Sequence, residues 1–327
     1  MRRVFKWLLE IGIIGFIVII LFELSYRFSV IDFYMPDFKA LNNEKEMSSK
    51  TVDYLVFGDS FSASKEGYVD LLRKSSNRTF INSSVPGIGI KQVNSFASRR
   101  LKEFEPKNIL YQVYVGNDLT DVNQLTNYKK LSIARNLYWD ISDIVLSAGF
   151  INYKLRHLNS KKKMVNSKFF NTSFNVENYN LRSKIYLKSD STYIYQAVTI
   201  TKSFRKRYLI WKEELVSFLN KIPENTNVYI VFIPHCTQLN SFYRDNISQI
   251  GAMFNEEHKF GKINYYFFEK ASLDFDSYKN VIFLNPLQKM RESDNINNRL
   301  YYLNDPHLNS TGQQVLTEYL REYLQLN

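Results

Sequence analysis

A run of apolar residues near the amino terminus is the strongest feature of the hydrophobic pattern. Ile11 to Phe22 contains no charged or hydroxyl side chain, and the window from Phe5 to Leu24 reaches the roughly 20 residues that a membrane-spanning helix needs. Basic residues precede this run and no small-residue cleavage pattern follows it, which disfavours a cleaved signal peptide. A buried amphipathic helix is also disfavoured, because the run is apolar on all sides. We therefore expect residues 1–28 to form an uncleaved single-pass anchor, with the body of the chain outside the cytoplasm.

Beyond this segment, short apolar or β-branched runs alternate with stretches of helical spacing. The runs are Val52–Phe57, Thr79–Asn82, Asn108–Tyr114, Val228–Ile233 and Val281–Leu284. Apolar residues recur at helical spacing in residues 89–104, in about 192–222 and in a last helix that follows Ser310. The alternation predicts an α/β domain over residues 51–327.

Two further segments complete the predicted organisation. Residues 29–50 are mixed and polar, which indicates a short stalk between the anchor and the domain. Roughly 110 residues separate the third and fourth apolar runs, too many for an ordinary crossover. We expect part of this stretch, residues 121–190, to form an insertion or cap.

Composition excludes several classes of protein. The single cysteine, Cys236, cannot form an intrachain disulfide, and one cysteine with four scattered histidines offers no zinc or iron–sulfur ligand set. We expect no cofactor and no metal. The formal charge is +11, from 43 basic and 32 acidic residues, and residues 154–221 alone contain fifteen basic and four acidic side chains. Such a segment is suited to an anionic partner, and a membrane anchor makes nucleic acid an unsuitable one.

Four short blocks of polar residues and glycines adjoin the predicted elements. Gly58-Asp59-Ser60 follows the first apolar run, 82–87 (Asn-Ser-Ser-Val-Pro-Gly) follows the second, 116–118 (Gly-Asn-Asp) follows the third, and 305–309 (Asp-Pro-His-Leu-Asn) precedes the last helix. A lone Gly-Asp-Ser is more often an ordinary turn. Four blocks are more informative, because the carboxyl ends of parallel strands share one edge of a sheet, where α/β proteins build their sites.

In these four blocks and their order, the chain resembles the SGNH hydrolases, the superfamily of GDSL esterases and acyltransferases. The resemblance covers residues 52–325 and implies a flavodoxin-like, three-layer α/β/α sandwich with a central parallel sheet. It implies Ser60 as nucleophile and His307 as its base, because a serine hydroxyl needs an imidazole to take its proton. It also implies an oxyanion hole of the Ser60 amide, the Gly87 amide and the Asn117 side chain, with Asp59 as a structural hydrogen-bond acceptor.

One position departs from the pattern of that superfamily, in which an aspartate lies three residues before the histidine. Here Asn304 occupies that place and Asp305 lies two residues before His307. Asn304 carries no charge to hold an imidazolium ion, so we expect Asp305 to orient His307, and a site of Ser60 and His307 alone remains open. His235 and Cys236 follow the fourth strand near the same edge. A cysteine nucleophile is disfavoured, since single cysteines are mostly buried and inert, and His235 is a candidate substrate contact.

Taken together, these features favour a membrane-anchored serine esterase or O-acyltransferase. We expect it to form an acyl-enzyme with small acyl groups, acetyl above all, on a glycan of the cell envelope, with other envelope proteins as candidate partners. Five Asn-x-Ser/Thr sequons, two of them at Asn82 and Asn309 beside the proposed site, favour a bacterial envelope, because glycans there would crowd the pocket. A lipid-directed esterase and a non-catalytic module that binds an acidic polymer through residues 154–221 stay open as alternatives.

Overall fold

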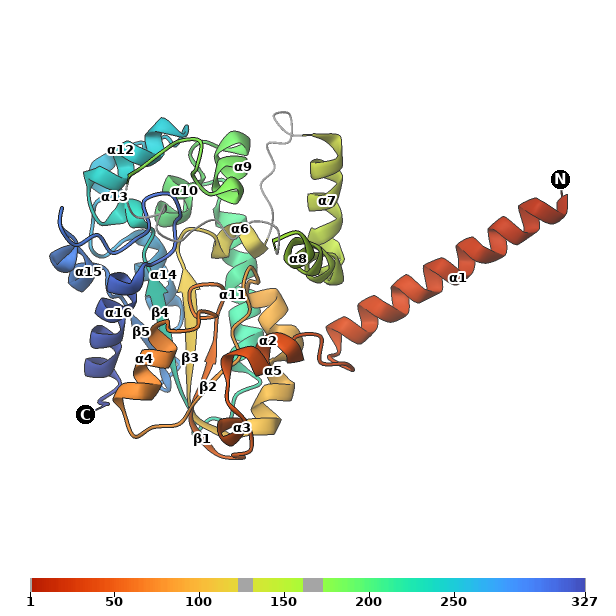
Figure 1. The fold of residues 1–327 in the computed structure, drawn as a ribbon, viewed down its shortest axis with the longest axis horizontal. Helices are drawn as coiled ribbons and strands as arrows, with labels where there is room; N and C mark the ends of the chain where they lie inside the picture. Colours follow the sequence, from red (N-terminus) through yellow and green to blue (C-terminus); the bar gives the residue numbers. More distant parts are fainter. Residues whose placement is uncertain (1, 123–131, 161–172, 327) are drawn as a thin grey trace.

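A five-stranded parallel sheet forms the centre of the domain in the computed structural model, which describes residues 2–122, 132–160 and 173–326 (Figure 1). The strands are β1 (Val52–Phe57), β2 (Phe80–Asn82), β3 (Pro106–Tyr114), β4 (Asn227–Ile233) and β5 (Val281–Leu284). Their order is β2-β1-β3-β4-β5, and every neighbouring pair is parallel. This is the flavodoxin-like strand order, and all five predicted runs are strands.

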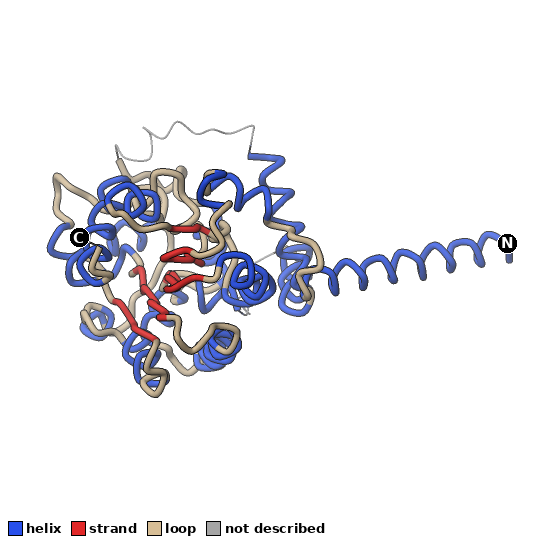
Figure 2. Tube along the Cα trace, turned by 90° about the horizontal axis from the view of Figure 1, so that it is seen from below, coloured by secondary structure: helices blue, strands red, loops and turns tan. Residues whose placement is uncertain are grey.

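Helices cover both faces of the sheet (Figures 1 and 2). One face carries α4 (Tyr68–Ser75) and α16 (Ser310–Tyr323), and the other carries α5 (Ile90–Phe104), α11 (Arg205–Leu219) and α14 (Tyr266–Asp274). Since both faces are covered, the inner strands β1, β3 and β4 are mostly buried along their length rather than alternating between buried and exposed positions. Phe57 packs its ring against Phe96 and Phe218, whereas Tyr54 stacks on Phe80 (ring centroids 4.6 Å apart) and bonds the carbonyl of Leu324 in the layer of α16.

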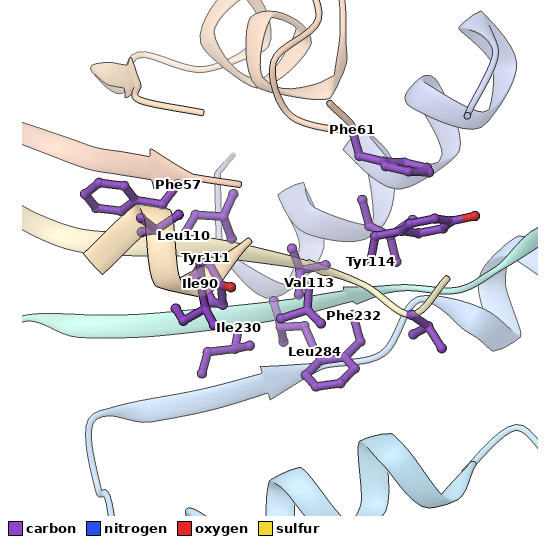
Figure 3. Packing of buried hydrophobic residues seen from close by; sticks show 14 of the residues in the cluster. Phe57, Phe61, Ile90, Leu110, Tyr111, Val113, Tyr114, Ile230, Phe232 and Leu284 are labelled. Carbon is purple, nitrogen blue, oxygen red and sulfur yellow. The ribbon is translucent and has the colours of Figure 1, made fainter. Parts of the chain in front are cut away.

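The apolar core continues from the sheet to its carboxyl edge (Figure 3). Val113 and Phe232 are fully buried in the sheet, and Phe61 and Tyr114 extend the cluster towards the loops at that edge. The three-layer α/β/α sandwich predicted for this chain is therefore confirmed. The core ends directly beneath the loops that carry the four polar blocks.

One predicted helix is divided in two. The stretch expected as a helix over 192–222 contains α10 (Tyr193–Thr199) and, after a break, α11. Ile200 ends α10 with a left-handed backbone, φ +44°. Thr199, Ile200 and Thr201 are consecutive β-branched residues, which lose rotamer freedom in a helix and so weaken it here.

The amino-terminal helix α1 (Arg2–Arg27) projects away from the domain (Figures 1 and 2). Residues 3–21 are exposed along its length. The helix is long and apolar enough to cross a membrane, and by the same measure it also fits a signal sequence.

Residues 29–50 differ from the stalk expected there. They contain α2 (Met35–Leu41) and α3 (Glu44–Met47), and Phe38 is buried against Phe104 and beneath the guanidinium of Arg100. The Asn42 side chain donates to the backbone carbonyl of Asn82 and accepts from its amide, both at 2.8 Å. The segment therefore packs on the domain, because its apolar residues have a surface to cover.

The stretch expected as an insertion contains helices that lie over the carboxyl edge of the sheet (Figure 1). They are α6 (Asp118–Val122), α7 (Ile133–Ile144), α8 (Leu146–Ser160) and α9 (Leu181–Ser189). Part of the basic segment, residues 161–172, lies outside the described residues. The remaining elements follow β4 and β5: η3 (Cys236–Gln238), α12 (Ser241–Gln249), α13 (Glu257–Phe260) and α15 (Leu287–Ser293).

Candidate active site

Ser60 lies in the turn that follows β1, at the carboxyl edge of the sheet. A side chain of the neighbouring strand holds this turn: the Gln112 side-chain oxygen accepts the Asp59 amide at 3.0 Å and the Ser62 hydroxyl at 3.1 Å. Gly58 makes room for it, since a Cβ there would lie 2.5 Å from that oxygen. A glycine at the end of β1 is therefore required by close approach rather than by an unusual backbone angle.

His307 reaches Ser60 from the loop before α16. The Ser60 Oγ lies 2.7 Å from the His307 Nε2, and the His307 Nδ1 is hydrogen-bonded to the Asp305 Oδ1. The Asn180 side chain donates to the other Asp305 oxygen at 2.8 Å. Hydroxyl, imidazole and carboxylate thus form one continuous hydrogen-bonded chain, the arrangement that activates a serine nucleophile.

The residue three positions before the histidine has a different role. Asn304 is buried, and its side chain accepts the Asn175 amide at 2.7 Å and donates to the Ser173 carbonyl at 2.8 Å. Both contacts tie the insertion to the loop that carries His307. The partner of the imidazole is therefore Asp305, at the shorter spacing that the sequence offers.

Charge and hydrogen bonds set the ionisation of this pair. Burial disfavours ionised Asp305, but His307 and the Asn180 amide outweigh burial and hold the pKa of Asp305 below its ordinary value. Burial likewise opposes protonation of His307, yet the hydrogen bond and charge of Asp305 raise the pKa of His307 above its ordinary value. An ionised Asp305 therefore strengthens His307 as a base towards Ser60.

A column of stacked rings fixes the plane of the imidazole. Phe61 stacks on His307 with ring centroids 4.8 Å apart, and Tyr114 stacks on the other face of Phe61 at 3.9 Å. His235 continues the column beside Tyr114 at 5.9 Å. Because Phe61 is the residue after Ser60, the same turn places the Ser60 hydroxyl and the ring that stacks on His307.

The three expected oxyanion donors lie beside Ser60 but are not equally free. Gly87 has φ +75°, and neither its amide nor that of Ser60 bonds another described residue. The Asn117 side-chain amide donates to Asp121 at 2.9 Å and more weakly to Asp59 at 3.4 Å. An oxyanion at this place would compete with two carboxylates for the Asn117 amide, and its role as a donor stays a prediction.

Three buried carboxyl groups lie beneath the site. Burial raises the pKa of Asp59, although the Phe61 amide, which donates to it at 2.9 Å, opposes the shift. Burial also raises the pKa of Asp118, and it raises the pKa of Asp121 to about 6 against the opposing charge of Arg182. Within the described residues, no group of three or more acidic, histidine or cysteine side chains is placed to hold a metal ion.

Two cavities open at Ser60. The larger, of about 320 Å³, is walled by aromatic and polar side chains of α7, α8 and α9, among them Tyr138, Trp139, Asn152, Tyr153, Arg182 and Tyr186. The smaller, of about 60 Å³, lies on the His307 side and includes Asn117, Asn180 and His235. Ser60 therefore lies where the two cavities meet.

Sequence reasoning missed the contribution of α9. Asn180, which holds Asp305, also accepts the Ser183 amide at 3.1 Å as the cap of this helix. Arg182 and Tyr186 line both cavities. An asparagine before a helix signals a cap and nothing more, so no motif in the insertion pointed to the site.

Cys236 and His235 take no part as a nucleophile and its base. Cys236 is buried and burial raises the pKa of its thiol, so the reactive thiolate is disfavoured. The His235 Nδ1 accepts the Thr237 amide at 3.3 Å, and burial lowers the pKa of His235 to about 3. His235 is thus neutral and lines the smaller cavity, and its contact with a substrate stays a prediction.

Comparisons with known proteins identify no family. No family model matches the chain, and no curated protein matches it. Among solved structures, the chain is similar to a crystal structure of the lipase Lip_vut3 from goat rumen metagenome, at 12% identity and a TM-score of 0.34, with 83% of this chain and 97% of that chain covered. A likeness this distant identifies neither a family nor an activity.

The raised pKa of His307 predicts a pH profile for any reaction that uses Ser60. Protonated His307 cannot accept the serine proton, so kcat/KM should fall as the pH drops through the His307 pKa, above the ordinary histidine value of 6.5. Asp305→Asn removes the charge that raises this pKa, so the acid limb should move to lower pH while kcat falls. The measurement is kcat/KM for a nitrophenyl ester from pH 5 to 9, and an unmoved limb would contradict the pairing of Asp305 with His307.

The positive φ of Gly87 predicts a loss of activity that exceeds its loss of stability. Gly87→Ala should cost about 1 kcal/mol of unfolding free energy, because an L-residue strains this backbone. The moved amide should lower kcat about a hundredfold. Gly251→Ala is the matched control: Gly251 has φ +99° and open space around it. Thermal melts and ester turnover compare the two variants, and equal kcat in both would remove the Gly87 amide from the site.

Proposed function

We propose that this protein is a serine-dependent acyl-transfer enzyme of the SGNH type that acts on ester bonds. The observation that carries the proposal is the hydrogen bond between Ser60 and His307, with Asp305 on the far side of the imidazole. In this reaction the Ser60 oxygen attacks the ester carbonyl while His307 takes its proton. The bond to the alcohol breaks as His307 returns that proton to it, which leaves an acyl group on Ser60.

The acyl-enzyme then passes its acyl group to an oxygen nucleophile. His307 takes a proton from water or from a sugar hydroxyl, and the new bond to the acyl carbon releases Ser60. The charged oxygen of each tetrahedral intermediate is assigned to the amides of Ser60 and Gly87, with Asn117 as the third donor. Neither amide bonds another described residue, which favours this assignment.

The cavity beside Ser60 favours a sugar carrying a small acyl group over a long acyl chain. Tyrosine and tryptophan rings alternate there with amide, hydroxyl and guanidinium groups. Among the described lining residues, the only aliphatic side chains are those of Ile185 and Pro86. Rings of this kind stack on sugar faces and polar groups bond their hydroxyls, whereas an acyl chain needs an apolar slot. An O-acetylated glycan of the cell envelope fits this lining better than a lipid ester does.

Helix α1 is assigned as the membrane anchor of this enzyme. Residues 3–21 expose apolar side chains along the whole helix, a surface that water does not favour and a bilayer covers. Arg3 and Lys6 before the apolar run favour a cytoplasmic amino terminus, which places the catalytic domain outside the cytoplasm.

Covalent labelling tests the nucleophile. A fluorophosphonate probe should modify the full-length chain in detergent and should fail to modify Ser60→Ala, because only an activated serine attacks phosphorus at a useful rate. Ser64→Ala, a change in the same loop, is the control and should label like the wild type. Labelling is read by gel fluorescence and by mass of the modified peptide.

Two results would count against the proposal. Labelling that persists in Ser60→Ala would assign the reactivity to another serine. A folded wild-type chain that takes no label would favour a non-catalytic module that binds an acidic polymer.

A further inference from the structure

Two arginines are among the residues that line the larger cavity. Arg182 comes from α9 and Arg135 from α7, and both line the 320 Å³ cavity that reaches Ser60. The cavity holds one carboxylate among its described lining residues, Asp121. Two positive charges therefore share a pocket with one negative charge, and that negative charge already pairs with Arg182.

Arg182 uses only part of its hydrogen-bonding capacity on the protein. Its Nη2 lies 2.5 Å from an Asp121 oxygen, and its Nε and Nη2 donate to the Tyr186 hydroxyl at 3.1 and 3.0 Å. Its Nη1 bonds no described residue and lies 3.7 Å from the place that a Cβ on Gly87 would occupy. The unused edge of the guanidinium therefore faces the loop of the oxyanion hole.

The pairing with Asp121 positions Arg182 without neutralising the cavity. About 30% of the Arg182 side chain is exposed, against 7% for Asp121, so the cation is the partner that faces the cavity. Asp121 is also bound to the Asn117 amide. Arg135 forms no ion pair with a described residue, and its side chain is half-buried. Guanidinium groups bind carboxylate and phosphate oxygens in pairs, which makes both arginines suited to an anion.

We propose that Arg182 and Arg135 form an anion subsite that selects a negatively charged substrate, a sugar bearing a carboxylate or a phosphate beside its O-acyl group. This inference rests on the proposed function in that it assigns the substrate of the same site. A neutral sugar would offer the Arg182 Nη1 a hydroxyl oxygen but no negative charge. An anionic sugar would satisfy it and hold the ester against Ser60.

Binding of sugars to the Ser60→Ala chain tests the subsite without relying on catalysis. Full-length Ser60→Ala protein in detergent is titrated by calorimetry with methyl glucuronide, glucose 6-phosphate and methyl glucoside. At least one anionic sugar should bind about tenfold or more tightly than the neutral one, and added salt should weaken it. The anion that binds more tightly identifies the carboxylate or the phosphate as the source of charge.

Three variants assign the charge preference to residues. Arg135→Gln should remove most of the preference, and Arg182→Gln combined with Asp121→Asn should remove it without leaving a buried unpaired carboxylate. Lys188→Gln, on the exposed side of α9, is the control and should keep it. Equal binding of charged and neutral sugars, absence of binding by both anions, or a preference that survives both arginine changes would overturn the proposal. None of these results bears on whether Ser60 reacts with a fluorophosphonate.

A second inference comes from the outer face of α7. Four aliphatic residues lie at helical spacing on one stripe, and their exposed fractions are Ile133 87%, Leu137 57%, Ile141 43% and Ile144 72%. The opposite side of the helix is the one that buries Trp139. Ile151 and Leu155 of α8 are also exposed, at 47% and 55%. Helix α7 is thus amphipathic with its apolar stripe pointing away from the domain.

This stripe is joined to the end of α1. Glu23 accepts the backbone amides of Leu146 and Ser147 at 3.0 and 2.9 Å, which caps the first turn of α8, and Arg27 donates to the Ile144 carbonyl. Phe150 packs its ring among those of α1 and the segment after it, Phe22, Tyr26 and Phe33. The junction of α7 and α8 is therefore held where α1 leaves the domain.

The geometry points to the lipid surface as the occupant of this stripe: α7 lies in the membrane interface beside α1. This inference rests on the proposed anchor. In Figure 1, α7 runs obliquely to α1, on the side of the domain from which α1 projects. An anchor that crosses the bilayer would then hold α7 beside the membrane interface, where an amphipathic helix buries its apolar side. The cavity at Ser60 would open one helix away from the lipid.

Lipid quenching of a fluorophore tests this placement. The full-length chain carries Leu137→Cys with an environment-sensitive dye, in vesicles of phosphatidylcholine and phosphatidylglycerol with spin-labelled lipid. Cys236 is buried and should remain unlabelled. The dye at 137 should be quenched several-fold more than the same dye in Leu273→Cys, an exposed position on α14 away from α1.

The outcomes separate the membrane from other occupants. Protein that floats with vesicles but is quenched equally at both positions overturns the placement. A dye at 137 that is shielded in detergent and unquenched by lipid also overturns it, in favour of a second copy of the chain. Protein that does not float with vesicles overturns the anchor and the placement together.

Discussion

The hydrogen bond between Ser60 and His307 joins two parts of the chain that are 247 residues apart. The rest of the architecture serves to hold these two atoms at that distance. Ser60 lies in the turn after β1, the second strand in the order of the sheet, and His307 precedes α16, the last helix of the same three-layer body. Both loops lie at the carboxyl edge of the parallel sheet, which brings the two side chains together despite their separation along the chain.

Rigidity at this point comes from neighbours of the reacting groups rather than from the groups themselves. Gln112 holds the turn of Ser60 from the adjacent strand, and Phe61 stacks on the imidazole. Asn180 holds Asp305 from the insertion, and Asn304 ties that insertion to the histidine loop. A misplacement of reacting groups by about 1 Å can cost a hundredfold in rate, so for the proposed reaction these neighbours matter as much as Ser60, His307 and Asp305 themselves.

The strands of the sheet and the four loop blocks could be predicted from the sequence, because each has a signal within a short stretch of neighbouring residues. Buried parallel strands appear in the sequence as apolar runs. Ser60, Gly87 and Asn117 follow such runs, and His307 precedes the strongly periodic last helix. The insertion was not readable in the same way, since Arg182 and Tyr186 reach the site through tertiary packing and carry no local motif. Ile200 shows the same limit, because a left-handed residue that ends α10 gives no signal of its own beyond its β-branched neighbours.

The contacts of Asn117 show why a family pattern cannot replace the geometry of the site. The pattern assigns its amide to an oxyanion, while here two carboxylates, Asp121 and Asp59, already accept from it. Arg182 shares Asp121 with Asn117, so the charge of Asp121 determines how strongly both donors are held. Burial raises the pKa of Asp121 to about 6, and the charge of Arg182 opposes that shift. The proposed recognition of an anion by Arg182 would therefore involve the same carboxyl group that holds the Asn117 amide.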